Sequence, residues 1–413
     1  MAKVEVRYNY RLRVHARQAQ LLQGVFDSCR FVWNQALGRW GDLWRHEGLS
    51  YSYRTAAAEL TDWRSRFEWL ADQPQCPQQQ TLRHLYRSIS AFLDKANPAG
   101  RPNYKKRRDG YATAEWTKNG FKVGGTGLGI AGDRLAIATS AGRLSLPVVW
   151  SRPLPTEPTS VTIYSDRAGR WFASFVVRLE VPEAPLDPTG RTTGLDVGLS
   201  TFATTEEDTT DIENPRFARM AAKALARSQR NTARKKKGSK NWARAKQRQA
   251  RLAAKVANQR ADFHHKAARH LIAAYDRIGI EDLKVKNMSR RGKGSSKTGL
   301  NRSIADASWG QFRHILTWQA TKAGKDIVAL PARDTTQTCS TCGEKANPRL
   351  ELSDRVFSCR CCGLVLGRDR NAARNLNPDR CGASAGGTES AGVAVPVGDD
   401  GTKPKVPAGT LAA

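Results

Sequence analysis

The sequence lacks the marks of several protein classes. No run of about 18 apolar residues occurs in its 413 residues, which argues against a transmembrane helix. It opens with alternating apolar and polar residues instead of a secretory signal, so we expect a cytoplasmic protein. Acidic residues are scarce, with 38 Asp and Glu against 68 Lys and Arg. The hydrophobic fraction of 39% is nevertheless enough for packed cores, which excludes extensive disorder.

The charge is the strongest feature of the composition. A net charge of +30 repels itself unless a polyanion neutralises it, and nucleic acid is the usual polyanion in cells. The cationic residues are also clustered, which a merely soluble basic protein does not require. A chain of this length is expected to form two to four folding units. We therefore expect a multidomain nucleic-acid-binding protein.

The first half of the chain predicts a sheet interrupted by helices. Residues 4–11 alternate in the manner of a strand, whereas residues 18–40 and 81–93 repeat apolar side chains at helical spacing. This pattern predicts a helical unit over about 15–95. Residues 120–182 are rich in strand-forming residues.

A hairpin and a linker follow in the sequence. Residues 161–164 and 171–179 flank the turn 166–169, which predicts an antiparallel pair. A linker is expected next, at three spaced prolines: Pro182, Pro185 and Pro188.

A basic loop is predicted at residues 98–114. Its cations lie between Tyr104 and Tyr111, and basic residues interleaved with aromatic ones suit phosphate contact and base stacking. An exposed charged turn explains the run equally well. The candidate nucleic-acid-binding residues here are Lys105, Lys106, Arg107 and Arg108.

The second half begins with a strand, a tight turn and a strand over residues 192–206. Residues 215–270 then form a helical stretch with 18 Lys and Arg and a single acid, Asp262, and a break is expected at Gly238. Ordinary surface helices mix both signs of charge, so this stretch is expected to face a phosphate backbone. The candidate contacts at the break are Lys235, Lys236, Lys237 and Lys240.

The remaining elements are short. Residues 277–283 predict an apolar strand that ends in acid, and the Ser-, Gly- and Lys-rich residues 289–303 predict a mobile loop. Residues 309–320 predict a helix and 327–330 a strand. From about residue 380 the composition predicts a disordered tail.

Two C-x-x-C-G knuckles predict a structural zinc site. Two thiolates three positions apart on a tight turn can both reach one metal, and the following glycine lets the backbone turn beneath it. Four thiolates close a tetrahedral shell and leave no position for water. The second knuckle also contains Cys361, but the spacing and the following glycine favour Cys362. The predicted ligands are Cys339, Cys342, Cys359 and Cys362.

Three acids form a second candidate site. Asp196 interrupts an apolar strand just before a turn, Glu281 ends another strand, and Asp369 opens a short helix. Each has an ordinary structural explanation on its own, as a strand end or helix cap. Together they suit hard divalent cations, because two such ions about 4 Å apart can drive phosphodiester hydrolysis. His264 and His265 are adjacent on a helix and point apart, so we interpret them as packing or phosphate contacts.

In order along the chain, four motifs resemble the signatures of TnpB proteins, transposon-encoded relatives of type V CRISPR effectors. The motifs are GLDVG (194–198), IEDLKVKNM (280–288), TTQTCSTCG (335–343) and RDRNAARNL (368–376). The resemblance covers about residues 1–377.

The resemblance implies a multidomain α+β fold. It implies a wedge-type β-barrel (1–14 and 96–183), an inserted helical recognition domain (15–95), a RuvC-like nuclease domain of the RNase H fold (190–334 and 364–379), an inserted four-cysteine zinc ribbon (335–363) and a disordered tail (380–413).

The resemblance also implies a function. Such proteins carry a guide RNA from the transposon end and cut double-stranded target DNA, with base pairing reading the sequence. Asp196, Glu281 and Asp369 would be catalytic ligands of two Mg²⁺ or Mn²⁺ ions, beside one structural Zn²⁺. We expect a nucleoid-associated monomer without membrane contact. A guided DNA-binding regulator without cleavage and a DNA transposase are the alternatives, and retention of all three acids disfavours the first.

Overall fold

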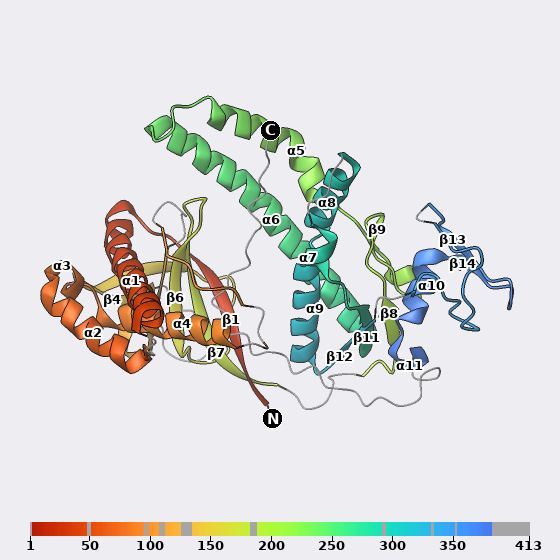
Figure 1. The fold of residues 1–413 in the computed structure, drawn as a ribbon, viewed down its shortest axis with the longest axis horizontal. Helices are drawn as coiled ribbons and strands as arrows, with labels where there is room; N and C mark the ends of the chain where they lie inside the picture. The colour runs from red at the N-terminus through yellow and green to blue at the C-terminus, as the bar shows by residue number, and fades with distance from the viewer. Residues whose placement is uncertain are drawn as a thin grey trace. The chain divides into compact units, whose positions relative to one another are not determined.

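The computed structural model describes residues 2–47, 51–94, 96, 99–106, 112–124, 134–181, 188–290, 295–331, 334–351 and 353–381 (Figure 1). The chain divides into two compact units. The N-terminal unit runs from Lys3 to Leu179, and the C-terminal unit begins at Glu180.

The N-terminal unit contains a seven-stranded sheet with the order β2-β6-β7-β1-β5-β4-β3. The predicted hairpin is confirmed, because β6 and β7 pair antiparallel and Ser165 lies opposite Trp171. The strands are β1 (Ala2–Leu12), β2 (Ala112–Thr117), β3 (Phe121–Val123), β4 (Arg134–Thr139), β5 (Gly142–Val149), β6 (Ser160–Ser165) and β7 (Trp171–Val181).

Strand β1 shows why the sheet has a buried face. Its side chains alternate, with Val6, Tyr10 and Leu12 buried while Glu5 and Arg7 are exposed. This is the period-two pattern expected from the sequence, and it faces an apolar core shared with the other strands and the first helix.

The helices of the N-terminal unit pack around a second apolar cluster. The two predicted helices are confirmed, and both are longer than their apolar stripes. The helices are α1 (Ala16–Asp42), η1 (Leu43–Glu47), α2 (Tyr53–Arg66), α3 (Glu68–Ala71) and α4 (Gln75–Leu93), with a short turn η3 (Lys118–Gly120) after β2.

The C-terminal unit is built on a three-stranded parallel sheet with the order β12-β11-β8. Its strands are β8 (Thr192–Leu195), β11 (Arg277–Glu281) and β12 (Asp326–Leu330). Two smaller pairs accompany it, β9 (Thr201–Ala203) with β10 (Ile212–Glu213), near the turn η4 (Asp208–Thr210), and β13 (Val356–Ser358) with β14 (Val365–Gly367).

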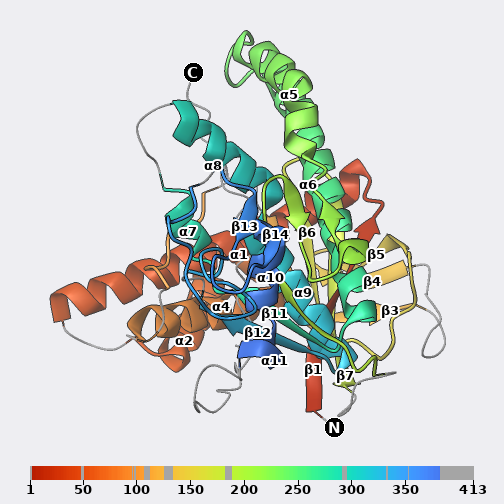
Figure 2. The same cartoon turned by 90° about the vertical axis from the view of Figure 1, so that its right-hand side faces the viewer.

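Helices α6 (Lys240–Ala274) and α9 (Trp309–Ala323) bury their apolar faces in one cluster with the sheet. The expected break of the basic stretch is confirmed, since α5 (Phe217–Ala233) ends before Gly238, whose φ is +87°. The other helices are α7 (Val285–Met288), α8 (Ser295–Ala307), α10 (Arg368–Asn375) and α11 (Pro378–Cys381). Both views show β13 and β14 beside α10 (Figures 1 and 2).

The prediction of a mobile loop over 289–303 is wrong for residues 295–303, which belong to α8. Tertiary packing overrides the Gly- and Ser-rich composition here, because Ile304 and Ala307 are buried in the core. The carboxylate of Asp306 also accepts hydrogen bonds from the backbone N–H groups of Ala218 and Arg219.

The prediction that the tail starts at about residue 380 is wrong for residues 380 and 381, which belong to α11. Arg380 lies in α11 and pairs with Glu206 at 3.3 Å, while Asp379 pairs with Arg277 at 2.6 Å. The composition of this segment could not predict these ion pairs, because their partners lie far away in the sequence. The rest of the predicted tail, residues 382–413, lies outside the described residues. No helix among those described is long and apolar enough to span a membrane.

Candidate functional site

Asp196 and Glu281 lie side by side because of strand register. Strands β8 and β11 are parallel, and Leu195 lies opposite Ile280. Asp196 and Glu281 are the next residues, at the carboxyl ends of neighbouring strands. Asp196 then exchanges backbone hydrogen bonds of 3.0 and 2.8 Å with Thr204, which fixes the turn that follows β8.

Two glycines let the helix of Asp369 approach this sheet. Gly194 and Gly279 are paired across β8 and β11. A Cβ at Gly194 would lie 1.8 Å from the carbonyl oxygen of Ala373, and one at Gly279 would lie 1.8 Å from that of Leu376. Helix α10 can therefore dock on the strands only where no side chain intervenes.

Both other acids affect the electrostatics of Asp196. Burial, together with the negative charges of Glu281 and Asp369, raises the pKa of Asp196 to about 8, while the charge of Arg368 acts in the opposite direction. Burial also raises the pKa of Glu281, while a hydrogen bond from Thr335 lowers it by a smaller amount. Close carboxylates that lack a compensating cation resist ionising together.

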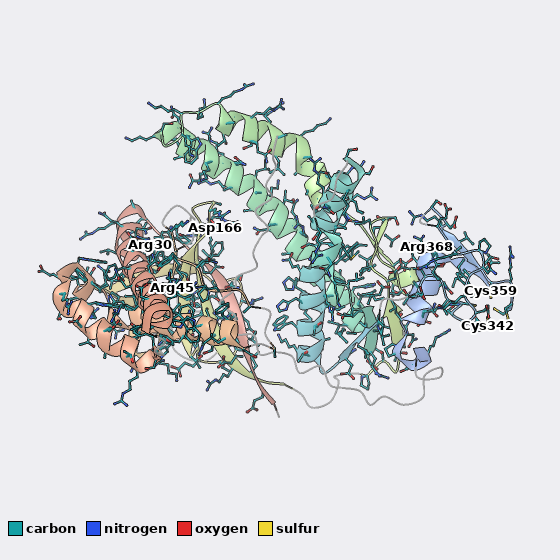
Figure 3. All side chains as sticks on the ribbon, viewed as in Figure 1. Arg30, Arg45, Asp166, Cys342, Cys359 and Arg368 are labelled. Carbon is teal, nitrogen blue, oxygen red and sulfur yellow. The ribbon has the colours of Figure 1, made fainter. Side chains whose placement is uncertain are left out.

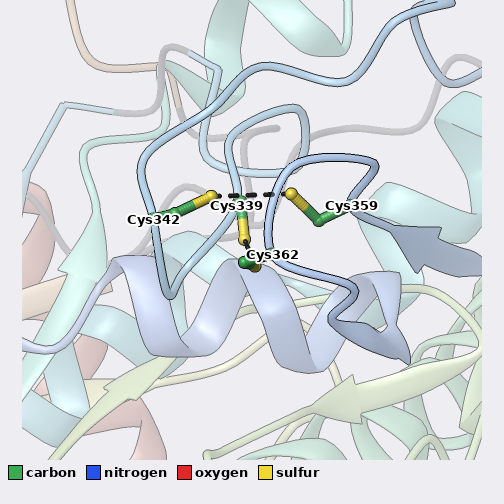
Figure 4. Close-up of side chains that lie close together, drawn as sticks. All are labelled: Cys339, Cys342, Cys359 and Cys362. Atoms are coloured by element: carbon green, nitrogen blue, oxygen red, sulfur yellow. Dashed lines mark hydrogen bonds between the residues drawn. The ribbon is translucent and has the colours of Figure 1, made fainter.

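The four predicted cysteines converge from two loops (Figure 4). Their sulfur atoms all lie within 4.8 Å of one another, with 3.6 Å between Cys339 and Cys362 and 3.5 Å between Cys342 and Cys359. These four residues could hold a metal ion, and the set fits zinc. Cys361 is exposed and lies outside the set.

The two knuckles share one backbone geometry. The N–H of Gly343 donates to the carbonyl of Cys339 at 3.0 Å, and that of Gly363 donates to Cys359 at 3.0 Å. Both glycines have positive φ, +77° and +73°, a conformation that most side chains disfavour. The C-x-x-C-G spacing therefore has the conformational basis that the sequence suggested.

Among the described residues, only the cysteines bring three or more candidate metal-ligating atoms within 4.8 Å of one another. The carboxylates are spaced more widely. Figure 3 shows Arg368, which precedes Asp369, on the same side of the C-terminal unit as Cys342 and Cys359.

Three residues that the sequence analysis did not single out join the two candidate sites. Thr335 donates a hydrogen bond of 2.7 Å from Oγ1 to Glu281 Oε1. Asn371 and Asn375 on α10 bond to the backbone of residues 335–340, at the first knuckle. The sequence did carry a sign of this role, because asparagines four residues apart share one face of a helix.

The cations of the predicted basic loop differ in their surroundings. The ammonium of Lys105 lies 3.7 Å from the centroid of the Trp33 ring, although the residue as a whole is exposed, and burial of its charged end lowers its pKa to about 8. Its backbone exchanges hydrogen bonds with the Asn34 amide, so Lys105 has an intramolecular role. Lys106 is exposed, while Arg107 and Arg108 lie outside the described residues.

The cations at the α5–α6 junction are exposed. Residues 215–261 contain no Asp or Glu, so no acid within this hairpin can pair with them. The set comprises Lys235, Lys236, Lys237 and Lys240.

The adjacent histidines pack separately, as expected. His264 is buried, bonds through Nε2 to the carbonyl of Ala307 at 3.0 Å and stacks on Phe202. Burial lowers its pKa to about 4, so its ring is neutral at physiological pH. His265 instead bonds through Nδ1 to Gln319 at 2.9 Å.

Comparison with known proteins gives three family matches. Residues 174–292 match the family described as "Probable transposase" (OrfB_IS605), and residues 309–376 match "Cas12f1-like, TNB domain". Residues 1–48 match a family described as "Helix-turn-helix domain"; in this structure they include strand β1 and helix α1.

Two relatives and one solved structure extend the match to most of the chain. A Streptomyces pristinaespiralis protein named "Putative RNA-guided DNA endonuclease" is 34% identical over 392 residues, 94% of this chain and 92% of the relative. "Putative RNA-guided DNA endonuclease InsQ" of Escherichia coli K12 is 33% identical, over 89% and 90%. A cryo-EM structure of a Cas12f1–sgRNA–target DNA complex shares the fold, with a TM-score of 0.55, 13% identity and coverage of 88% and 83%. The resemblance carried by the four motifs is thus confirmed, and the chain belongs to the TnpB family.

Proposed function

We propose that this protein is an RNA-guided endonuclease that hydrolyses phosphodiester bonds of double-stranded DNA at a RuvC-like site. The two relatives named as RNA-guided DNA endonucleases match it over nearly their whole length. The observation that carries the proposal is the register of β8 and β11, which brings Asp196 and Glu281 to adjacent strand ends beneath the helix of Asp369.

The donor set fits hard divalent cations. Carboxylate oxygens are the ligands that Mg²⁺ and Mn²⁺ prefer, and the raised pKa of Asp196 reflects its burial first and the neighbouring charges of Glu281 and Asp369 second. Two such ions about 4 Å apart are the arrangement that drives phosphodiester hydrolysis at carboxylate sites. When bound, such ions would supply activation of water and stabilisation of the leaving oxygen.

The acids, the strands and the cysteines would each have a separate role. Asp196, Glu281 and Asp369 would hold the cations, and the strand register and the glycine contacts would keep them in place. The cysteine set would hold one Zn²⁺ and stabilise the loops of residues 335–363, without a chemical role.

The other assignments follow the family. We assign residues 190–334 and 364–379 to the nuclease domain, 15–95 to target recognition, and 1–14 with 96–183 to a wedge-type barrel. The exposed cations Lys106, Lys235, Lys236, Lys237 and Lys240 are proposed to contact the nucleic acid backbone. Guide RNA and double-stranded DNA are the proposed partners of a monomeric, cytoplasmic protein.

The test begins with RNA that co-purifies with Asp196→Ala expressed in its host. Sequencing should find one discrete RNA with a constant structured part and a variable end, and the variable end names the DNA target. The parent protein should cut that duplex in Mg²⁺, whereas Asp196→Ala should bind it without cutting. Asp262→Asn, which changes an exposed acid of the same unit, is the matched control and should cut normally.

The outcomes separate the alternatives. Cleavage that survives Asp196→Ala refutes the site. Guided binding without cleavage by the parent protein would favour a regulator, and joining of cut ends to new DNA would favour a transposase, the activity named in one family description. A mixture of unrelated RNAs would point to an unguided nuclease.

A further inference from the structure

Glu281 is held by a residue outside the three-acid set. The hydroxyl of Thr335 donates to Glu281 Oε1 at 2.7 Å, across 54 positions of sequence. Thr335 is itself buried, with 9% of its surface exposed. A hydroxyl in this place occupies one lone pair of the carboxylate, and so restricts the directions in which Glu281 can offer its oxygens to a cation.

Thr335 is in turn fixed by helix α10. The side-chain amide of Asn375 donates to the carbonyl of Thr335 at 2.8 Å and to that of Thr338 at 2.7 Å. The turn itself is closed by hydrogen bonds from the N–H groups of Gln337 and Thr338 to the carbonyl of Asp334, whose φ is +60°. Such a backbone conformation persists where the surroundings hold it.

The same face of α10 also forms hydrogen bonds to the backbone at the first cysteine knuckle. Asn371, which is fully buried, accepts a 2.9 Å hydrogen bond from the N–H of Ser340 and donates one of 2.7 Å to the carbonyl of Thr338. Ser340 directly follows Cys339. Hydrogen bonds of Asn371 and Asn375 thus link the backbone next to Cys339 to Thr335, whose hydroxyl bonds to Glu281.

We propose that Thr335 is a positioning residue that orients Glu281 for divalent cation binding, and that Asn375 holds Thr335 in place from the helix that carries Asp369. This inference rests on the proposed nuclease function. It also implies that the two proposed metal sites are coupled. The loop that orients Glu281 is hydrogen-bonded to α10 and continues into the first cysteine knuckle.

The test measures Mn²⁺ binding to the full-length, zinc-loaded protein without DNA, by electron paramagnetic resonance of the free ion. Thr335→Val keeps the shape but removes the hydroxyl, and it should weaken Mn²⁺ binding by about 10-fold or more. Thr335→Ser keeps the hydroxyl and should bind like the parent. Equal Mn²⁺ affinity in Thr335→Val and the parent overturns the proposal.

A second variant covers the case in which Thr335→Val folds poorly, as judged by its zinc content and thermal unfolding. Asn375→Ala leaves the hydroxyl present but releases the turn, so it should weaken Mn²⁺ binding as well. In the double variant the two losses should not add, because both act through one orientation of Glu281. Additive losses, or normal binding by Asn375→Ala, would overturn the role of Asn375.

Failure of the proposed function gives a different result. If Asp196→Ala binds Mn²⁺ as well as the parent does, the cation site itself is wrong. If Asp196→Ala loses binding while Thr335→Val keeps it, the nuclease proposal stands and the positioning role is refuted.

Discussion

Gly194 and Gly279 allow the α10 segment to pack against the sheet because neither residue has a Cβ. Each stands where a Cβ would overlap a backbone carbonyl of the α10 segment. Backbone cannot swing aside as the end of a flexible side chain can, so the helix must move to relieve the overlap.

We therefore expect Gly194→Ala to destabilise the C-terminal unit by about 2–4 kcal/mol and to abolish cleavage. Thermal unfolding and a cleavage assay measure the two effects. Gly299→Ala is the control, because that glycine lies in α8 with nothing within 4 Å of the added Cβ. Helix propensity should make the control neutral or more stable, by up to about 1 kcal/mol. Wild-type stability in Gly194→Ala would mean that α10 does not dock here.

Asp196 should also make stability depend on pH. Its pKa in the folded protein, about 8, is raised above its ordinary value of 3.8. The folded state therefore holds a proton that the unfolded state has already lost, so this contribution is complete below pH 3.8 and disappears as the pH rises to 8.

Asp196→Asn should remove that dependence. Without added Mg²⁺, we expect the variant to gain about 1–3 kcal/mol of stability over the parent at about pH 8 and little at about pH 4, since each pKa unit corresponds to about 1.4 kcal/mol and residual solvent contact reduces the effect. Denaturant unfolding at both pH values measures it. Added Mn²⁺ should stabilise only the parent. Parallel pH profiles for the two proteins would contradict the assigned cause.

At the scale of elements, the knuckles and the basic hairpin act through different forces. On the proposed function, a metal would hold the four thiolates of the knuckles together, whereas a polyanion would offset the charge of the α5–α6 hairpin. The first interaction is local and tight, and the second is diffuse and sensitive to salt.

We expect Cys339→Ser to lower the zinc content below one ion per chain and to lower the Tm of the C-terminal unit, because metal binding contributes directly to folding. Cys361→Ser is the matched control and should keep its zinc, since Cys361 is exposed and outside the set. Zinc content by atomic emission decides the matter. Full occupancy in Cys339→Ser would refute the ligand assignment.

We expect Lys236→Gln with Lys237→Gln to weaken nucleic acid binding and to reduce the slope of log affinity against log salt by about two, one per lost phosphate contact. Lys322→Gln with Lys345→Gln removes the same charge from exposed sites of the C-terminal unit outside α5 and α6, and should change the slope little. Equal slopes for the two double variants would mean that net charge, and not the hairpin, controls binding.

At the scale of the whole molecule, the +30 charge should make the free protein less stable than its complex with RNA. Removal of bound RNA by nuclease should lower the Tm by several degrees at low salt, because the cations then repel one another. Raising the ionic strength should recover part of the loss by screening. An unchanged Tm after RNA removal would mean that the guide does not neutralise this charge.

Much of this molecule could be predicted because its patterns are local. The alternation in β1, the helical stripes of α1 and α4, the break at Gly238 and the C-x-x-C-G spacing each depend on residues close in sequence. The three acids were also selected from the sequence, by their positions at strand ends and a helix start and by the family motifs.

The local elements named above, the spacing of the four cysteines and the excess charge thus follow from the sequence alone. Three features instead depend on tertiary contacts: residues 295–307 form a helix, the ammonium of Lys105 packs on Trp33, and Thr335 bonds to Glu281. The physical reason is distance along the chain. Thr335 and Glu281 are 54 residues apart, and a hydrogen bond between them exists only because β11 and α10 pack where glycine leaves room.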